Sequence, residues 1–352
     1  MIRNQRIPQT LLLSGPEGVG KATLARRFGA LLLGDSQERK GSGAHNDQDQ
    51  EPDRANLRFA RIRQEIEQDD LSLESNLAIV ADREKWPADK RNDDPLFFAS
   101  HPDFLTFAPD GPLRQITIQQ MRFLKDRATL KPLKGDRRVF LIDHIDRANE
   151  QAANSLLKTL EEPPPHLILI MTARNPYDLL PTIRSRAVPL AMSRLSDDEM
   201  LAFCASRALD RPEMRRKLAE GSPGVAVSLD LEAYVQRRAA MFALLKVAGG
   251  MEPFGSWLKH SDSIAARRTE KLDSYLEALY MLLEDVLRLA NGVTSIRNED
   301  LRAELEPLAR RVSFDWLRAA VERVDELVEL VRRNIQKSIA FDAFAADLRS
   351  AR

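Results

Sequence analysis

The chain has 352 residues, enough for about two or three domains. Lys plus Arg and Asp plus Glu both number 53, so the zero net charge disfavours a stand-alone nucleic-acid-binding protein. The single cysteine, Cys204, excludes an internal disulfide framework and, with five scattered histidines, a zinc cluster. Because the sequence lacks a long apolar run and a recognisable signal peptide, we expect a cytoplasmic protein without a membrane segment.

A glycine-rich stretch, GPEGVGKAT, follows the apolar run Leu11–Leu13 and leads into a helical segment predicted to stop at Gly34. A strand that turns through glycines into a helix directs several N–H groups and the positive dipole end at one point, which favours phosphate. In the motif G-x-x-x-x-G-K-[ST], Gly15 and Gly20 allow close backbone approach and Lys21 contacts the phosphates. The sequence therefore predicts a phosphate-binding loop.

The metal-binding part of this motif is missing. Ala22 stands where a hydroxyl should bind Mg²⁺, and the hydroxyl of Thr23 is turned by about 100° around the helix, so it should not reach the same ion. Asp143, after the apolar strand Arg138–Ile142, matches the acid that holds the metal in such sites. The next residue is His144, where a water-activating carboxylate would be expected.

A polar insertion is predicted at residues 35–95. Residues 35–56 contain nothing apolar larger than alanine, so they cannot bury enough surface to offset the entropy of ordering, and we expect them to be mobile. Residues 57–66 have helical spacing, whereas the following charged stretch is broken by Pro87 and Pro95.

Beyond residue 101, short apolar strands alternate with amphipathic helices, as in an α/β fold with a parallel sheet and flanking helices. Strands are predicted at residues 103–107, 138–142, 167–171 and 187–190. Between them the spacing predicts helices at 117–130, with Thr117 as the cap, and at 149–162.

The rest of the chain is predicted to be helical. Ser196 begins a helix with a capping box that ends at Glu199, Pro212 begins another, and long amphipathic stripes follow, with Asn298 as a further cap. Most such stripes form internal core. The predicted domains are an α/β phosphate-loop domain, a small helical domain and a C-terminal helical bundle, at residues 1–192, 193–232 and 233–352.

The run NEQAANSLLKTLEEPPPHLILIMTARNPYDLLPTIRSRA, residues 149–187, resembles the bacterial clamp-loader branch of the AAA+ proteins. The pattern of that branch is an N-x-x-A-x-N-x-L-L-K-x-L-E-E-P-P helix followed by L-x-x-T-I-x-S-R-C. The sequence His-Pro-Asp at 101–103 belongs to the same pattern. The resemblance implies an AAA+ domain, a helical lid domain and a helical collar that assembles subunits into a hetero-pentamer.

Within the branch the chain is more similar to the delta prime type of subunit than to the gamma/tau ATPases. Ala22 and His144 are two departures from the ATPase pattern. Gly224 is a third, because it stands where the ATPases carry a sensor-2 arginine. The sensor-1 region falls near Ala173 and Arg174, and neither is the small polar type expected. This joint loss implies a relaxed site that requires no cofactor or metal, or that holds ATP, ADP or phosphate without hydrolysis.

The resemblance assigns Arg186, in Ser185-Arg186-Ala187, as an arginine finger that reaches in trans the γ-phosphate of ATP in a neighbouring subunit. Arginine suits this task because its planar fork spreads charge over phosphoryl oxygens without deprotonating. Arg184 is the nearest alternative. The resemblance also implies a degenerate nucleotide site formed by Gly15, Gly18, Gly20, Lys21, Thr23 and Asp143.

The implied function is that of a non-catalytic delta prime subunit of the replicative clamp loader, a component of the DNA polymerase III holoenzyme. With gamma/tau and delta subunits it would help to load the sliding clamp onto primer-template DNA. The alternative is an active gamma/tau-like ATPase that uses Thr23 and Asp143. Two differences from the family are the polar insertion in place of a cysteine-ligated zinc module, and an N-terminus that lacks the family's first helix through a late gene start or a loss in this lineage.

Overall fold

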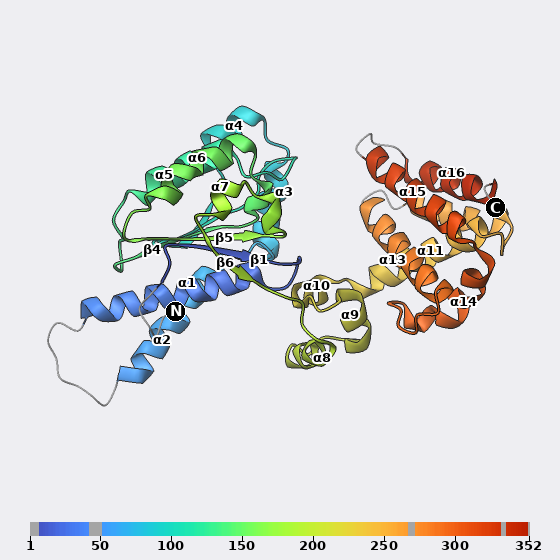
Figure 1. The fold of residues 1–352 in the computed structure, drawn as a ribbon, viewed down its shortest axis with the longest axis horizontal. Coiled ribbons are helices and arrows are strands. Elements are labelled where there is room, and N and C mark those ends of the chain that lie inside the picture. The colour runs from blue at the N-terminus through green and yellow to red at the C-terminus, as the bar shows by residue number, and fades with distance from the viewer. Residues whose placement is uncertain (1–6, 42–50, 267–271, 332–335, 351–352) are drawn as a thin grey trace. The chain divides into compact units, whose positions relative to one another are not determined.

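The structure, a computed structural model, describes residues 7–41, 51–266, 272–331 and 336–350. The chain divides into two compact units, residues 1–195 and 196–352, which we describe separately. The first unit contains a sheet covered by helices, and the second contains helices (Figure 1). The domain boundaries at residues 192 and 232 stay predictions.

A sheet of six strands in the order β2-β3-β4-β5-β1-β6 organises the first unit. The strand β1 lies between β5 and β6 and is parallel to both, whereas β2 is antiparallel to β3 at one edge. The antiparallel β2 was not predicted. The strands are β1 (Thr10–Ser14), β2 (Phe98–His101), β3 (Phe104–Phe107), β4 (Arg138–Ile142), β5 (Leu167–Ala173) and β6 (Val188–Ala191).

Helices cover both faces of this sheet (Figure 1). They are α1 (Lys21–Gly41), α2 (Glu51–Glu67), α3 (Glu74–Arg83), α4 (Ala88–Asp93), α5 (Ile118–Ala128), α6 (Glu150–Glu161) and α7 (Pro181–Arg184). Because side chains of a strand alternate between faces, Leu11 and Leu13 pack in the cluster under α1 and α2, while Leu12 packs in the cluster under α5 and α6. This arrangement confirms the predicted α/β phosphate-loop fold.

The insertion is more helical than predicted. The first helix does not stop at Gly34 but runs on to residue 41, because a glycine lowers helix stability by only about 1 kcal/mol and no proline follows it in the helix. The predicted mobile stretch 35–56 is helical at both ends, and its middle, 42–50, lies outside the described residues. Pro87 does not break the chain into a loop, because it stands at the N-cap of α4, where its missing N–H costs nothing.

In the first unit the predicted cap holds. The Thr117 hydroxyl accepts a hydrogen bond from the N–H of Gln120 at 3.3 Å, and the Gln120 side chain accepts from the N–H of Thr117 at 2.8 Å. The capping box predicted from Ser196 to Glu199 is also present, at the start of the second unit. Both caps satisfy N–H groups that the first turn of a helix leaves without partners.

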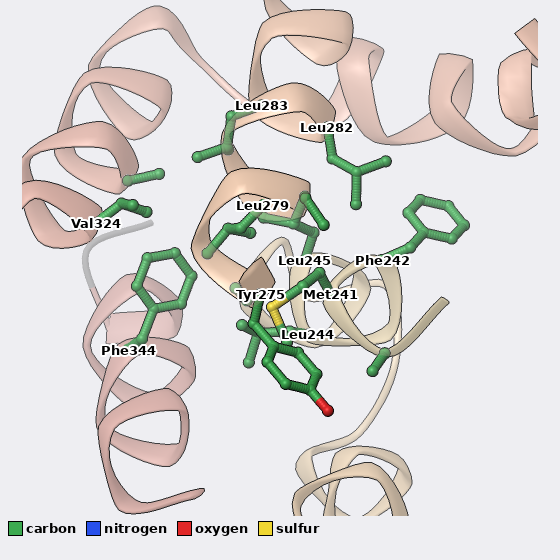
Figure 2. Close-up of a cluster of buried hydrophobic side chains, with 14 of the residues drawn as sticks. Met241, Phe242, Leu244, Leu245, Tyr275, Leu279, Leu282, Leu283, Val324 and Phe344 are labelled. Atoms are coloured by element: carbon green, nitrogen blue, oxygen red, sulfur yellow. The ribbon is translucent and has the colours of Figure 1, made fainter. Parts of the chain in front are cut away.

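The second unit is helical throughout its described part. A buried apolar cluster joins α11, α13, α15 and α16 through residues such as Met241, Tyr275, Leu279, Val324 and Phe344 (Figure 2), which confirms most of the predicted stripes as internal core. Val321 and Val328, predicted on the stripe of α15, are exposed instead. In the described residues of the chain, no helix is long and apolar enough to cross a membrane. The helices are α8 (Asp197–Ser206), α9 (Pro212–Ala219), α10 (Pro223–Ser228), α11 (Leu231–Ala248), α12 (Phe254–Ala266), α13 (Leu272–Ala290), α14 (Arg302–Arg311), α15 (Phe314–Val331) and α16 (Lys337–Ser350).

Asn298 stands at the predicted N-cap, before the 3-10 turn Glu299–Leu301, but its side chain makes no cap hydrogen bond. Its Oδ1 accepts hydrogen bonds from the Tyr234 hydroxyl at 2.8 Å and from Arg238 Nη1 at 2.9 Å, and its Nδ2 donates to Asp285 Oδ2 at 2.8 Å. Asp285 is fully buried and also accepts the N–H of Arg297 at 2.7 Å. The buried side chain of Asn298 satisfies more hydrogen-bonding groups in this network than it would by capping a helix at the surface. It therefore links α11 to α13.

The His-Pro-Asp motif at residues 101–103 also has a structural role. The fully buried carboxylate of Asp103 accepts the N–H groups of Leu133 and Lys134, each at 2.7 Å, and lies 3.8 Å from Arg138 Nε. The N–H of Asp103 donates to His101 Nδ1 at 3.1 Å. These contacts fasten the loop between α5 and β4 to the start of β3.

We expect Asp103→Ala to lower the free energy of unfolding by about 3 kcal/mol, because it leaves the N–H groups of Leu133 and Lys134 without their acceptor and removes the carboxylate that faces the buried Arg138 guanidinium. Urea denaturation followed by circular dichroism measures the loss. The matched control is Asp136→Ala in the same loop. Asp136 is partly exposed, and its ion pair with Arg137 Nε is weak because the two atoms are 4.0 Å apart. Its effect should stay within about 0.5 kcal/mol, and equal losses in the two variants would contradict the assignment.

Candidate functional site

The glycine-rich loop lies at the carboxyl end of β1, where parallel sheets commonly bind ligands. It is tied to both neighbouring strands, because the N–H of Gly15 donates to Ala173 O at 3.2 Å and the N–H of Met192 donates to Ser14 O at 2.7 Å. The loop then enters α1 at Lys21. The sheet therefore fixes both the start of the loop and the helix that follows it.

Three glycines have backbone angles that favour glycine. Their φ values are +149° at Gly15, +73° at Gly18 and +94° at Gly20. A Cβ atom added to Gly15 would stand 2.2 Å from the backbone oxygen of Met192, whereas one added to Gly20 would meet open space. Gly15 is thus required by a close approach of backbone as well as by its own conformation.

The side chain of Lys21 is almost fully buried and folds back on the loop. Its Nζ donates to the carbonyl oxygens of Gly15 and Pro16, each at 2.7 Å. Burial lowers the pKa of Lys21, and the nearby carboxylates of Asp143 and Asp146 partly oppose that shift. An ammonium has three N–H donors, so the loop itself uses two of them.

The hydroxyl of Thr23 does not replace the one missing at Ala22. Thr23 is exposed to solvent, on a different side of α1 from the buried Lys21, as the helical rotation predicts. Asp143 is buried directly after β4, and its carboxylate is near enough to Lys21 to raise the pKa of that lysine. The residue after it, His144, has a left-handed backbone with φ of 58°. The position directly after Asp143 therefore holds an imidazole and not a carboxylate.

Thr172, which the sequence analysis did not single out, connects these residues. Its hydroxyl donates to Asp143 Oδ1 at 2.5 Å and accepts the N–H of His144 at 2.8 Å. The prediction placed the sensor-1 region near Ala173 and Arg174, directly after this threonine. A threonine within the apolar strand LILIMTA, facing a strand that ends in aspartate, was the signal that could have identified it.

Arg186 lies just after α7 and is partly exposed, with 34% of its side chain accessible. Its Nη2 donates to Glu161 Oε1 at 2.8 Å, and its Nη1 donates to Thr182 O at 2.9 Å and to Ser185 Oγ at 3.3 Å. All these partners belong to α6, α7 or the residue after α7. The structure therefore does not bring Arg186 into contact with the glycine loop of its own chain in the part that is described.

The neighbouring Arg184 is engaged differently. Its guanidinium carbon lies 5.0 Å from the centre of the exposed Tyr177 ring, a cation–π contact. Ala187, which replaces the cysteine of the family motif, is buried in the sheet cluster, so a small apolar side chain is what the position accommodates. Gly224 lies in α10 of the second unit, and its correspondence to a lost sensor arginine stays a prediction.

Sequence models of two families match the chain. The family described as DNA polymerase III, delta subunit, matches residues 88–196, and the one described as DNA polymerase III, delta subunit, C terminal, matches residues 256–341. A DNA polymerase III subunit delta' of Escherichia coli K12 is 29% identical over 239 residues, which is 65% of this chain and 68% of that relative. One from Pseudomonas aeruginosa is 33% identical over 148 residues, 41% of this chain and 45% of that relative. The chain belongs to the DNA polymerase III delta prime family.

Similarity to other members of the polymerase is more limited. A gamma/tau subunit of Mycobacterium bovis is 44% identical over 69 residues, which is 20% of this chain and 12% of that relative. Among solved structures, a gamma subunit-related protein from Thermotoga maritima is 19% identical and covers 99% of this chain and 96% of its own, with a TM-score of 0.43. A TM-score this low adds nothing to the sequence matches.

Membership of the delta prime family confirms the expected role as a subunit of the clamp loader. The similarity does not extend to the roles of single residues. The arginine finger and the degenerate nucleotide site therefore stay predictions at this point, as does the binding of any nucleotide. Among the described residues, no group of three His, Cys, Asp or Glu side chains is placed to hold a metal ion.

We expect Gly15→Ala to destabilise the first unit by about 2 kcal/mol or more, since the new Cβ would collide with backbone and the φ angle is strained for alanine. Gly20→Ala is the matched control. It should cost about 1 kcal/mol, because only the backbone angle is unfavourable there. Urea denaturation of both variants provides the comparison, and a smaller loss at Gly15 than at Gly20 would contradict the close approach.

Proposed function

We propose that the protein is a non-catalytic, cytoplasmic subunit of the bacterial clamp loader that supplies Arg186 in trans to the ATP site of a neighbouring gamma/tau subunit. The observation that carries this proposal is a contrast between two sites. The glycine loop has no hydroxyl at Ala22 and its Lys21 is bonded to the loop itself. Arg186, in contrast, is partly exposed and keeps unused donors.

The hydrogen bonds of Arg186 support a role outside its own chain. A guanidinium has five N–H donors, and Glu161, Thr182 and Ser185 use three of them. One N–H on Nε and one on Nη2 are left without a partner in the described part of the chain. Such a pair can bind two oxygens of one phosphoryl group, which is how an arginine finger stabilises charge in phosphoryl transfer. Because Arg186 does not contact the loop of its own chain, we infer that the nucleotide belongs to a neighbour.

The competing reading, an active gamma/tau-like ATPase, has less support. Hydrolysis requires Mg²⁺ held by a hydroxyl beside the loop lysine and a group that orients the attacking water. Thr23 is exposed on another side of α1, and His144 follows Asp143 where a carboxylate would be needed. The geometry therefore favours a chain that hydrolyses ATP negligibly by itself.

We further propose that gamma/tau and delta subunits are the direct partners, in a hetero-pentamer, and that the sliding clamp and primer-template DNA are reached through this complex. Residues 233–352 would join a helical collar. The exposed residues Phe314, Val321 and Val328 of α15 support this part of the proposal. They recur every seven residues on a helix that buries Trp316, Leu317, Ala320, Val324 and Leu327 on another side, a spacing that suits burial against a helix of another subunit.

In the reconstituted complex, we expect Arg186→Ala to lower the DNA-stimulated ATPase rate by about tenfold or more, since a finger arginine is worth roughly 10³-fold or more at the site it serves. Gel filtration should show unchanged assembly, because Arg186 is a surface residue. Arg184→Ala, which removes the cation–π contact with Tyr177, is the matched control and should have little effect. An unchanged ATPase rate in the Arg186→Ala complex would refute the finger.

We propose that the glycine loop binds at most the phosphates of ATP or ADP, without metal and without hydrolysis. Calorimetric titration of ATP into the purified chain should then give the same affinity with Mg²⁺ as with EDTA. The gamma/tau subunit, which retains the metal hydroxyl in its motif, is the control and should lose affinity in EDTA. ATP turnover by the purified chain that disappears in Lys21→Ala would instead establish the active-ATPase alternative.

A further inference from the structure

A carboxylate that the clamp-loader role does not account for lies against Arg186. Glu161 is the last residue of α6, and three prolines, Pro163 to Pro165, follow it and end the helix. Its Oε1 accepts a hydrogen bond from Arg186 Nη2 at 2.8 Å. The two residues are 25 positions apart in sequence, so the fold, rather than the local helix, creates this pair.

The backbone on both sides of this pair is anchored in the core. Leu160, next to Glu161, and Ile183, in α7, are both buried in the apolar cluster on one face of the sheet. The N–H of Arg186 donates to the carbonyl oxygen of Ile183 at 3.1 Å, which closes the turn after α7. Neither member of the pair therefore depends on a flexible loop for its position.

The acceptors around Arg186 hold opposite parts of its guanidinium. Glu161 binds Nη2, while the carbonyl oxygen of Thr182 and the hydroxyl of Ser185 bind Nη1. With both terminal nitrogens bonded, the planar group cannot rotate freely, although N–H groups on Nε and Nη2 stay available. An arginine on a surface otherwise samples many rotamers, and that freedom would be lost when it meets a phosphate.

We propose that Glu161 is a positioning residue for Arg186. Its carboxylate fixes the guanidinium in the free subunit, so that the unused N–H groups are already ordered when the neighbouring nucleotide arrives. The inference rests on the proposed role of Arg186 as a finger in trans. Glu161 itself does not contact the nucleotide.

The donors that stay available distinguish positioning from inhibition. If Glu161 occupied every donor of Arg186, it would have to leave before a phosphate could bind, and its removal would speed hydrolysis. It accepts from one nitrogen only, so the finger can bind an anion while the pair is intact. Both side chains of the pair are partly exposed, Arg186 at 34% and Glu161 at 50%, which makes the pair a weak contributor to folding.

The experiment uses the reconstituted complex of this chain with gamma/tau and delta subunits, and measures kcat and KM of DNA-stimulated ATP hydrolysis. For Glu161→Ala we expect kcat to fall about fivefold with KM unchanged, because the finger acts in the transition state and preorganisation is what the variant loses. Glu161→Gln keeps an oxygen that accepts the same hydrogen bond, so it should recover most of the rate.

Glu162→Ala is the matched control. Glu162 is the exposed neighbour of Glu161, and its side chain has no partner in the described part of the chain, so kcat should not change. The melting temperature of the purified Glu161→Ala chain should equal that of the parent, and a clear decrease would overturn the inference in favour of a structural role. In the double variant with Arg186→Ala, the loss should not exceed that of Arg186→Ala alone.

The inference and the proposed function fail in different ways. If Arg186→Ala lowers kcat while Glu161→Ala leaves it unchanged or raises it, the finger stands and the positioning role is refuted. If Arg186→Ala leaves kcat unchanged, the finger itself is refuted, and the positioning role falls with it. A Glu161→Gln variant as slow as Glu161→Ala would also overturn positioning through this hydrogen bond.

Discussion

The parallel register of β4, β5 and β1 is the constraint on which the nucleotide-like site depends. Ser14 pairs with Ala173, and Ile142 pairs with Met171, so the residues that follow β1 and β4 meet the end of β5 at one edge of the sheet. This register places Thr172 beside Asp143 and the glycine loop beside both. A one-residue shift would turn Thr172 and Asp143 to opposite faces of the sheet and separate them.

The packing of the same sheet does not depend on the residues of the glycine loop. Its strands are held by buried apolar side chains on two faces, and no metal or nucleotide is needed to complete either cluster. The catalytic positions sit at an edge, where Ala22 or His144 removes chemistry and little packing. Arg186 follows α7, whose Ile183 packs in the apolar cluster on one face of the sheet. The position of Arg186 therefore does not depend on the residues of the glycine loop.

Sequence reasoning succeeded where a residue's neighbours along the chain determine its surroundings. Continuous apolar runs predicted β1, β4 and β5 nearly to the residue. It failed for β2, whose sequence FASH has no apolar alternation and pairs only at an edge. Thr172 and Glu161 escaped notice for a related reason, because their partners are 29 and 25 positions away and only the fold brings them together. The insertion helices likewise depend on packing that composition does not reveal.

The bonds from Lys21 to Gly15 and Pro16 have a thermodynamic consequence for the subunit. A ligand stabilises a fold only by as much as it binds that fold more tightly than the unfolded chain, at the ligand concentration present. In this loop the Lys21 ammonium already donates hydrogen bonds to the carbonyl groups of the turn, so the turn keeps its conformation without a bound ligand. With the function proposed above, changes in cellular ATP would act on the neighbouring gamma/tau subunits and leave the conformation of this loop much the same.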